Sequence, residues 1–244
     1  MKKRLNSGSL VAIFGLVLVL STGYLIAILP GAPPNTRAAI LMRLGLTLLW
    51  IGLGGILIRL MRDPIQSVFQ NIKVDPRITF VLFATFLALI EELITTTLTS
   101  LAPVFGVPVG AAYITASGNY LDVVCLHSVV VFIPMFIGWA FLLSRYTFSP
   151  NAVFLLFGIT GVVAETMYGG GQALLEAGLW VFVYGLMVYL PACIFPANRE
   201  ARPPQWWHYV AAILLPLVLA IPVAVIIGFV HPVRVHFPPM QPGS

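Results

Sequence analysis

Long uninterrupted runs of apolar residues dominate the chain, and short polar segments separate them. Each run is about 18–25 residues long, which is the length a helix needs to cross the hydrocarbon core of a membrane. The strands of a membrane barrel would instead alternate polar and apolar residues. In lipid, every backbone polar group must be paired internally, and continuous apolar runs achieve this as helices. The pattern therefore predicts an all-α fold, a polytopic integral membrane helix bundle.

We expect about seven transmembrane helices, within a single transmembrane domain that covers residues 1–244. The expected spans are residues 9–30, 38–60, 78–100, 119–144, 151–169, 173–195 and 208–230. The first span follows a basic segment, as a signal peptide does, but its apolar run is longer, so we expect it to remain uncleaved. Ser149 and Pro150 predict a capped start for the fifth span, and the glycines at 169–171 predict its end.

The composition supports lipid as the main partner of this chain. Of its 244 residues, 59% are hydrophobic and only 9% are charged, against roughly 25% charged in soluble domains. The net charge is +5, but the basic residues lie in short loops, which argues against nucleic acid. Other membrane subunits and a membrane-embedded substrate both remain open as further partners. Cys125 and Cys193 fall inside expected spans and have neither disulfide nor zinc spacing.

The distribution of Lys and Arg predicts the orientation, because cytoplasmic loops carry an excess of them. One side receives Lys2, Lys3, Arg4, Arg59, Arg62, Lys73, Arg77, Arg145, Arg199 and Arg202. The other side receives only Arg37 and Arg234, and Arg43 lies within a span. We therefore expect a multi-pass protein of the cell membrane with its N-terminus cytoplasmic and its C-terminus outside.

Two segments are typical of the membrane surface. Between residues 63 and 77, four apolar residues recur at helical spacing and predict a short amphipathic helix on the cytoplasmic side. They are Ile65, Val68, Phe69 and Ile72. Trp206, Trp207 and Tyr209 predict an interfacial aromatic belt where the last span begins.

Ionisable residues within apolar spans are costly to bury and therefore point to function. Glu91 and Glu92 lie deep in the third span. One stripe of that helix is small and polar, and comprises Thr85, Ala88, Glu92, Thr95 and Thr99. We expect Glu92 to face the interior of the bundle and Glu91 to lie at the edge of the stripe. A catalytic pair and a protonated, hydrogen-bonding structural pair are both consistent with this pattern.

Other polar residues in the spans have two interpretations each. His127 lies about two turns into the fourth span. Its side chain could be a ligand or a hydrogen-bonding group whose partners are all within the protein. Asp122, three residues after the capping residue Asn119, favours a structural role at a helix start. Glu165 shares a stripe with Gly158, Gly161 and Gly169, which predicts a close helix contact. A structural hydrogen bond and an active-site role are both consistent with this position of Glu165.

Arg43 and Glu176 lie near the ends of their spans. Arg43 either reaches the headgroups or acts as a counter-charge for Glu92 or Glu165. Glu176 opens the sixth span, where a carboxylate favours a helix N-terminus.

The segment Ala88-Leu89-Ile90-Glu91-Glu92-Leu93 resembles the Glu-Glu motif of the CAAX-processing and bacteriocin-processing intramembrane proteases, and of the related PrsW-type proteases. The resemblance implies that the Glu pair and a His on the next span act on a water, sometimes with a metal. His127 matches that position, which makes His127 and Glu92 the implied ligands of a divalent metal. The chain departs from the pattern where Thr95 and Thr96 replace a basic residue, and where Val123 replaces an aromatic one. A second intramembrane His is not expected, since His208 lies at the cytoplasmic end, and His231 and His236 in the tail.

These residues favour an intramembrane hydrolase or protease-like enzyme with its site in the middle-to-outer half of the bilayer. Its catalytic residues would be Glu91, Glu92, His127 and Glu165, and its substrate-binding residues Arg43 and Thr95. Whether the chain is an enzyme stays open at this point. The alternatives are a non-enzymatic transporter, a structural subunit of a membrane complex, and an enzyme that modifies isoprenoids or carotenoids. The isoprenoid or carotenoid alternative is a resemblance to membrane enzymes of that kind. It rests on Glu91-Glu92, the loop at residues 105–110, Glu165 and Trp180.

Overall fold

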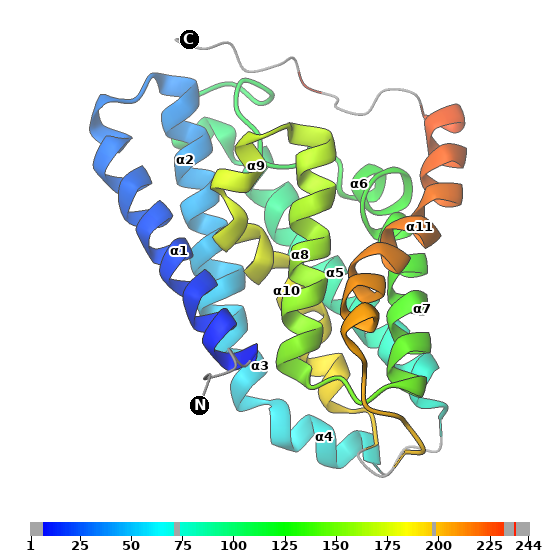
Figure 1. Cartoon of the computed structure of the whole chain (residues 1–244). Helices are drawn as coiled ribbons and strands as arrows, with labels where there is room; N and C mark the ends of the chain where they lie inside the picture. The colour runs from blue at the N-terminus through cyan, green and yellow to red at the C-terminus, as the bar shows by residue number, and fades with distance from the viewer. Residues whose placement is uncertain (1–6, 71–73, 197–198, 232–236, 238–244) are drawn as a thin grey trace.

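The computed structural model describes residues 7–70, 74–196, 199–231 and 237. The chain is all-α, 81% helical, with no strand in the described part. The helices, shown in Figure 1, are α1 (Ser7–Ile28), α2 (Pro34–Leu46), α3 (Gly55–Leu60), α4 (Arg62–Gln70), α5 (Pro76–Ser100), α6 (Tyr120–Leu126), α7 (Val129–Arg145), α8 (Pro150–Gly169), α9 (Gln172–Leu175), α10 (Ala177–Cys193) and α11 (Trp206–Val230). Two short 3₁₀ turns, η1 (Leu29–Gly31) and η3 (Ala102–Phe105), and a π-helical segment, η2 (Thr47–Gly54), connect some of them.

Five helical segments of the described chain are long and apolar enough to cross a membrane. They are residues Ser7–Gly31, Pro34–Leu60, Pro76–Ser100, Pro150–Met167 and Trp206–Val230. The bent pair α6 and α7 adds a sixth if the two helices form one span, and α10 is a shorter apolar helix. The expected all-α fold with several helices able to span a membrane is therefore confirmed, whereas the number of seven spans and the sides of the two termini stay predictions.

Two expected spans differ from the observed helices. Residues 119–144 were expected as one helix, but α6 and α7 meet at an angle of 43°. The N–H groups of His127 and Ser128 both donate to the carbonyl of Val123, which ends α6 and lets α7 start in a new direction. The expected span 173–195 is likewise divided, because Glu176 separates the short α9 from α10.

The helix ends follow the local chemistry of the sequence. The hydroxyl of Ser149 accepts a hydrogen bond from the N–H of Ala152 at 3.2 Å, and Pro150 occupies the first turn of α8. Gly170 follows α8 with a φ of 72°, a conformation that glycine adopts without steric cost. Asp75 caps α5 by accepting the N–H of Arg77 at 2.8 Å.

The amphipathic helix expected at residues 63–77 is α4, which lies across the lower end of the bundle in Figure 1. Phe69 of α4 stacks on Phe83 of α5, with ring centroids 5.6 Å apart. Ile72 and Lys73 lie outside the described residues.

The centre of the bundle is formed by α5, which packs against α7 and α10, while α10 packs closely against α8. Glycine makes the α8–α10 contact possible. A Cβ added to Gly161 would lie 2.3 Å from the ring of Tyr184, and one added to Gly158 would lie 2.6 Å from the carbonyl oxygen of Val181. The close approach predicted from the small-residue stripe is therefore present, and it brings Glu165 of α8 toward α10.

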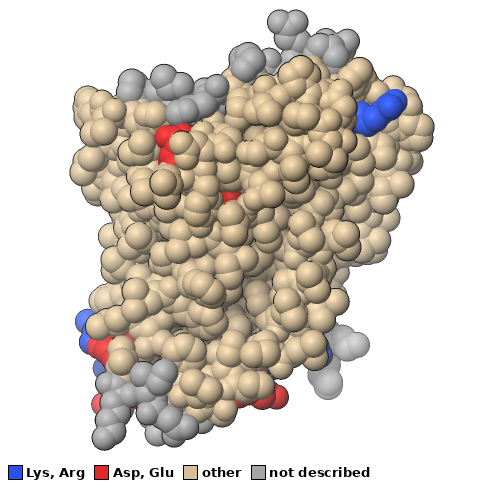
Figure 2. All heavy atoms as spheres, turned by 180° about the vertical axis from the view of Figure 1, so that it is seen from behind, with Lys and Arg blue, Asp and Glu red and all other residues tan. Residues whose placement is uncertain are grey.

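The outer surface is apolar, as a lipid-facing surface must be. Helix α1 lies at the edge of the bundle in Figure 1, and of its side chains only Leu18 is buried. Figure 2 shows one face of the molecule, on which most charged atoms gather toward the two ends. Trp206, Trp207 and Tyr209 are exposed where α11 begins, as expected of an interfacial belt.

Candidate functional site

Three carboxyl groups lie close together inside the bundle. Glu91 and Glu92 of α5 are only 4% and 5% exposed. Glu165 of α8 is partly buried, and the three carboxyl groups lie within electrostatic range of one another. Glu91 was expected at the edge of its stripe, but it is as buried as Glu92. The reason is that α7 and α10 both pack against α5 and cover the directions of both carboxyl groups, while Leu82, Phe86 and Leu93 on the remaining face stay exposed.

Hydroxyl groups from neighbouring residues hold these carboxyl groups in place. Glu92 accepts a hydrogen bond from Thr95 at 3.2 Å, within α5, and a second from the hydroxyl of Ser128, at the α6–α7 break. Glu165 accepts a hydrogen bond from the buried hydroxyl of Tyr184 in α10. The carboxyl groups of Glu92 and Glu165 therefore each have a fixed direction, and their hydrogen bonds join α5 to the α6–α7 break and α8 to α10.

A second cluster lies beside the α6–α7 break and contains Asp122, His127 and His231. Nε2 of His127 is 3.5 Å from Oδ2 of Asp122, and Nε2 of His231 is 3.3 Å from Oδ1 of the same carboxylate. The two imidazole rings meet nearly edge to face, with centroids 5.3 Å apart. One ligand atom from each residue lies within 4.8 Å of the other two, and all three residues are partly buried.

The sequence folds locally in a way that builds this second cluster. The side chain of Asn119 caps α6 by accepting the N–H of Leu121 at 3.1 Å, which fixes the first turn and with it Asp122. The backbone of His127 leaves the helical conformation, with φ −133° and ψ −85°. His231 follows the last residue of α11 and reaches the cluster from the other end of the chain.

Two histidines and a carboxylate are a common ligand set for zinc and for other divalent transition metals. Two ligands of a tetrahedral zinc ion, each about 2.1 Å from the metal, lie roughly 3.4 Å apart. The two N–O distances, 3.5 and 3.3 Å, are close to that separation, and each imidazole faces a different oxygen of the Asp122 carboxylate. The residues present therefore fit a divalent metal with three protein ligands.

The structure brings together some of the predicted site residues and separates others. Glu91, Glu92, Glu165 and Thr95 share the interior cluster. His127 was expected beside Glu92. It lies instead in the second cluster, with Asp122 and His231, and that cluster does not include Glu92. The two clusters are still adjacent along the chain, because Ser128, the hydrogen-bond partner of Glu92, directly follows His127.

Arg43 has a different partner from the two expected. Its guanidinium forms an ion pair with Glu176, at the start of α10, and not with Glu92 or Glu165. The side chain of Arg43 is 12% exposed, so it does not reach out to the headgroups. Glu176 was assigned only a favourable position at a helix start, yet it provides the counter-charge that the burial of Arg43 requires.

Sequence reasoning missed Asp122 and His231 as partners of His127. Asp122 was interpreted as a capping residue and His231 as part of the tail. One signal was present: the loop charges place the start of the fourth span and the end of the seventh on the same side of the membrane. That placement allows Asp122 and His231 to meet.

Comparisons with protein-family models, with curated proteins and with solved structures gave no match for this chain. The resemblance to the Glu-Glu proteases therefore rests on the residues of the motif alone.

Proposed function

We propose that this chain is a seven-span protein of the cell membrane that carries a metal-dependent hydrolase site near its outer surface. Two further crossings, by the bent pair α6 and α7 and by α10, would bring the five long segments to seven. The excess of Lys and Arg in one set of loops supports a cytoplasmic N-terminus and an external C-terminus. The clusters then lie in the middle and outer parts of the bilayer.

The observation that carries the proposal is the meeting of Asp122, His127 and His231, with their ligand atoms within 4.8 Å of one another. These three residues would hold a divalent metal. A bound zinc ion lowers the pKa of a coordinated water, which makes hydroxide available at neutral pH.

Glu92 is the general base in this proposal. Its carboxyl group is buried and held by Thr95 and Ser128, so its oxygen atoms are oriented before a substrate binds. Glu91 and Glu165 lie within electrostatic range in the same interior cluster. This arrangement parallels the Glu-pair and His chemistry that the motif resemblance implies.

Metal binding tests the proposal directly. The purified protein is loaded with Zn²⁺ in detergent, desalted, and its metal content measured by mass spectrometry. We expect about one equivalent per chain and its loss in Asp122→Ala, His127→Ala and His231→Ala. Glu200→Gln, which changes an exposed carboxylate at the other end of the bundle, is the matched control and should keep the metal. Wild-type protein without bound zinc would contradict the proposal.

Hydrolysis is then measured with labelled casein and p-nitrophenyl acetate as probe substrates. The expected result is turnover that depends on the metal and is abolished in Glu92→Gln, although this variant keeps its zinc. Equal turnover in Glu92→Gln and wild type would remove Glu92 from the catalytic role.

A second candidate function is proton-coupled transport. It is favoured by the position of Glu91, Glu92 and Glu165 in the bundle interior, where intramembrane carboxyl groups often relay protons. Reconstitution into vesicles with an internal pH-sensitive dye distinguishes the two functions. Proton flux that is lost in Glu91→Gln but unaffected by His231→Ala would favour transport over hydrolysis.

A further inference from the structure

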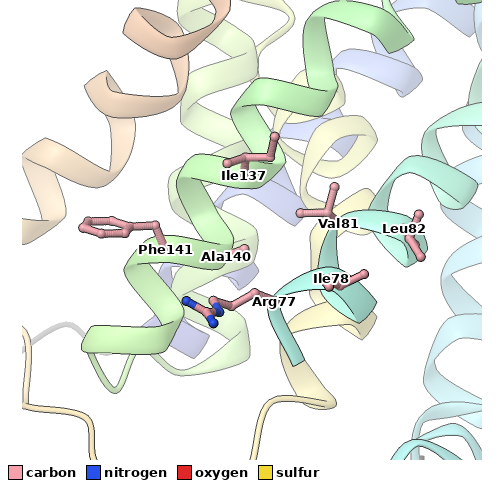
Figure 3. Close-up of a pocket in the computed structure, with 7 residues that line it drawn as sticks. All are labelled: Arg77, Ile78, Val81, Leu82, Ile137, Ala140 and Phe141. Carbon is pink, nitrogen blue, oxygen red and sulfur yellow. The ribbon is translucent and has the colours of Figure 1, made fainter. Parts of the chain in front are cut away.

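A groove of about 400 Å³ runs between α5 and α7, at the end of the bundle opposite to the Asp122 cluster. Figure 3 shows side chains from both helices along it. They are Ile78, Val81, Leu82, Ile137, Ala140 and Phe141, with Arg77 at the end. We name this feature the α5–α7 groove. Apart from Arg77, its lining is apolar.

Two arginines lie at the end of the groove where α5 begins and α7 ends. Arg77 stands in the first turn of α5, and its side chain is 60% exposed. Arg145 is the last residue of α7, and its guanidinium lies 4.6 Å from the ring centroid of Phe141, a residue of the groove. Arg77 therefore lines the groove, and Arg145 contacts Phe141, one of the residues that line it.

Part of the guanidinium of Arg77 is available for a ligand. Asp75 accepts hydrogen bonds from Nε and Nη2 of Arg77 at 3.0 and 2.5 Å. Among the described residues, Nη1 of Arg77 has no hydrogen-bond partner. A guanidinium binds phosphate through such N–H groups, and arginine is favoured over lysine where the phosphate contacts two donors.

The surrounding charge at this end is positive. The N–H of Arg202 donates to the carbonyl of Arg145 at 2.9 Å, and the guanidinium of Arg199 donates to the carbonyl of Leu143 at 2.8 Å. Both residues therefore lie beside the end of α7. The acidic residues nearby along the chain are Asp75 and Glu200, so the cations outnumber the anions. This balance favours a ligand with a net negative charge.

We propose that the α5–α7 groove binds one anionic phospholipid, with an acyl chain along the apolar lining and the phosphate at Arg77 and Arg145. The groove supplies what a lipid needs in the required order along the membrane normal: an apolar channel within the bilayer and cations at the headgroup level. A zwitterionic lipid fills the same channel but gains less from the cations.

Native mass spectrometry of the full chain in detergent tests the proposal, with phosphatidylglycerol and phosphatidylcholine as probes. Wild-type protein should retain phosphatidylglycerol in preference to phosphatidylcholine. Arg77→Gln combined with Arg145→Gln should weaken retention of phosphatidylglycerol about thirtyfold. The matched control is Arg59→Gln, an exposed arginine of α3 that does not line the groove, and it should retain the lipid as wild type does.

A second variant tests the acyl chain. Ile137 is 52% exposed and lines the groove, so Ile137→Trp fills the channel without disturbing the core. It should also lose phosphatidylglycerol, while Leu57→Trp on exposed α3 should not. Three results would overturn the proposal: equal retention of the two lipids by wild type, equal losses in the control variants, or displacement of the lipid by millimolar inorganic phosphate. Loss of phosphatidylglycerol retention in the arginine variant but not in Ile137→Trp would also overturn the proposal. Such a result would indicate that the arginines bind an anion on the surface and that no lipid lies in the groove.

Discussion

The hydroxyl group of Tyr184 donates a hydrogen bond to a carboxyl oxygen of Glu165, joining α10 to α8 inside the membrane bundle. The same ring packs against Gly161, one turn before Glu165, where a side chain would collide with it. A single aromatic residue therefore both fills the closest helix contact and satisfies a buried carboxyl group. The first two predictions concern this contact.

Tyr184→Phe should lower the free energy of unfolding by about 1–3 kcal/mol, because a partly buried carboxyl oxygen loses its hydrogen-bond donor. Thermal unfolding in detergent measures the effect. Tyr189→Phe on the same helix is the control, since among the described residues the Tyr189 hydroxyl has no hydrogen-bond partner. Equal stabilities of the two variants would show that the bond to Glu165 does not contribute.

Gly161→Leu should lower the melting temperature far more than Leu156→Ala does, because the added side chain meets the Tyr184 ring. Gly23→Leu is the matched control. An added Cβ at Gly23 meets nothing within 4 Å, since this part of α1 faces outward. If Gly161→Leu and Gly23→Leu behave alike, the close α8–α10 contact is not present in the membrane.

Glu92→Gln, His127→Ala and the double variant should be about equally inactive if the two residues belong to one catalytic unit. All three should fold, and only the variants that lack His127 should lose bound metal. Activity, metal content and thermal stability are measured on the same preparations. Unfolding of both single variants, with recovery in the double, would indicate a structural pair and favour the non-enzymatic alternatives.

The topology can be tested with single cysteines in a background that carries Cys125→Ser and Cys193→Ser. Ser67→Cys in α4 and Val104→Cys in η3 are exposed positions at opposite ends of the bundle. A membrane-impermeant maleimide should label Val104→Cys in intact cells and label Ser67→Cys only after lysis. Labelling of both from outside would contradict the proposed orientation.

The cap of α5 gives a prediction about pH. Hydrogen bonds from Arg77 lower the pKa of Asp75 to about 2, below the value of about 3.9 in an unfolded chain. A lowered pKa means that the cap stabilises the fold above about pH 4 and that this contribution disappears as the pH falls toward 2. The stability difference between wild type and Asp75→Asn should therefore be constant from pH 7 to 5 and vanish near pH 2, as measured by thermal unfolding. A difference that persists at pH 2 would contradict this assignment.

The fold class could be predicted because hydropathy, caps and glycine spacing are local signals. Ser149, Gly161 and the burial of Glu92 were all interpreted correctly from their neighbours in the chain. The break at His127 was not predictable in this way, because hydropathy continues through it and does not report helix direction. The pairing of Arg43 with Glu176 joins residues far apart in sequence, and a single sequence holds no information about which distant charge will be the partner.

The position of His231 has a consequence for biogenesis. Asp122 and His127 lie near the middle of the chain, whereas His231 follows the final helix. The ribosome releases His231 only after α1 to α11 have been made, so the three-residue cluster cannot assemble during early insertion. A chain truncated after α11 could enter the membrane with its bundle formed and still lack the third ligand. With the metal site proposed above, metal loading would therefore report that α1 to α11 have been synthesised and inserted.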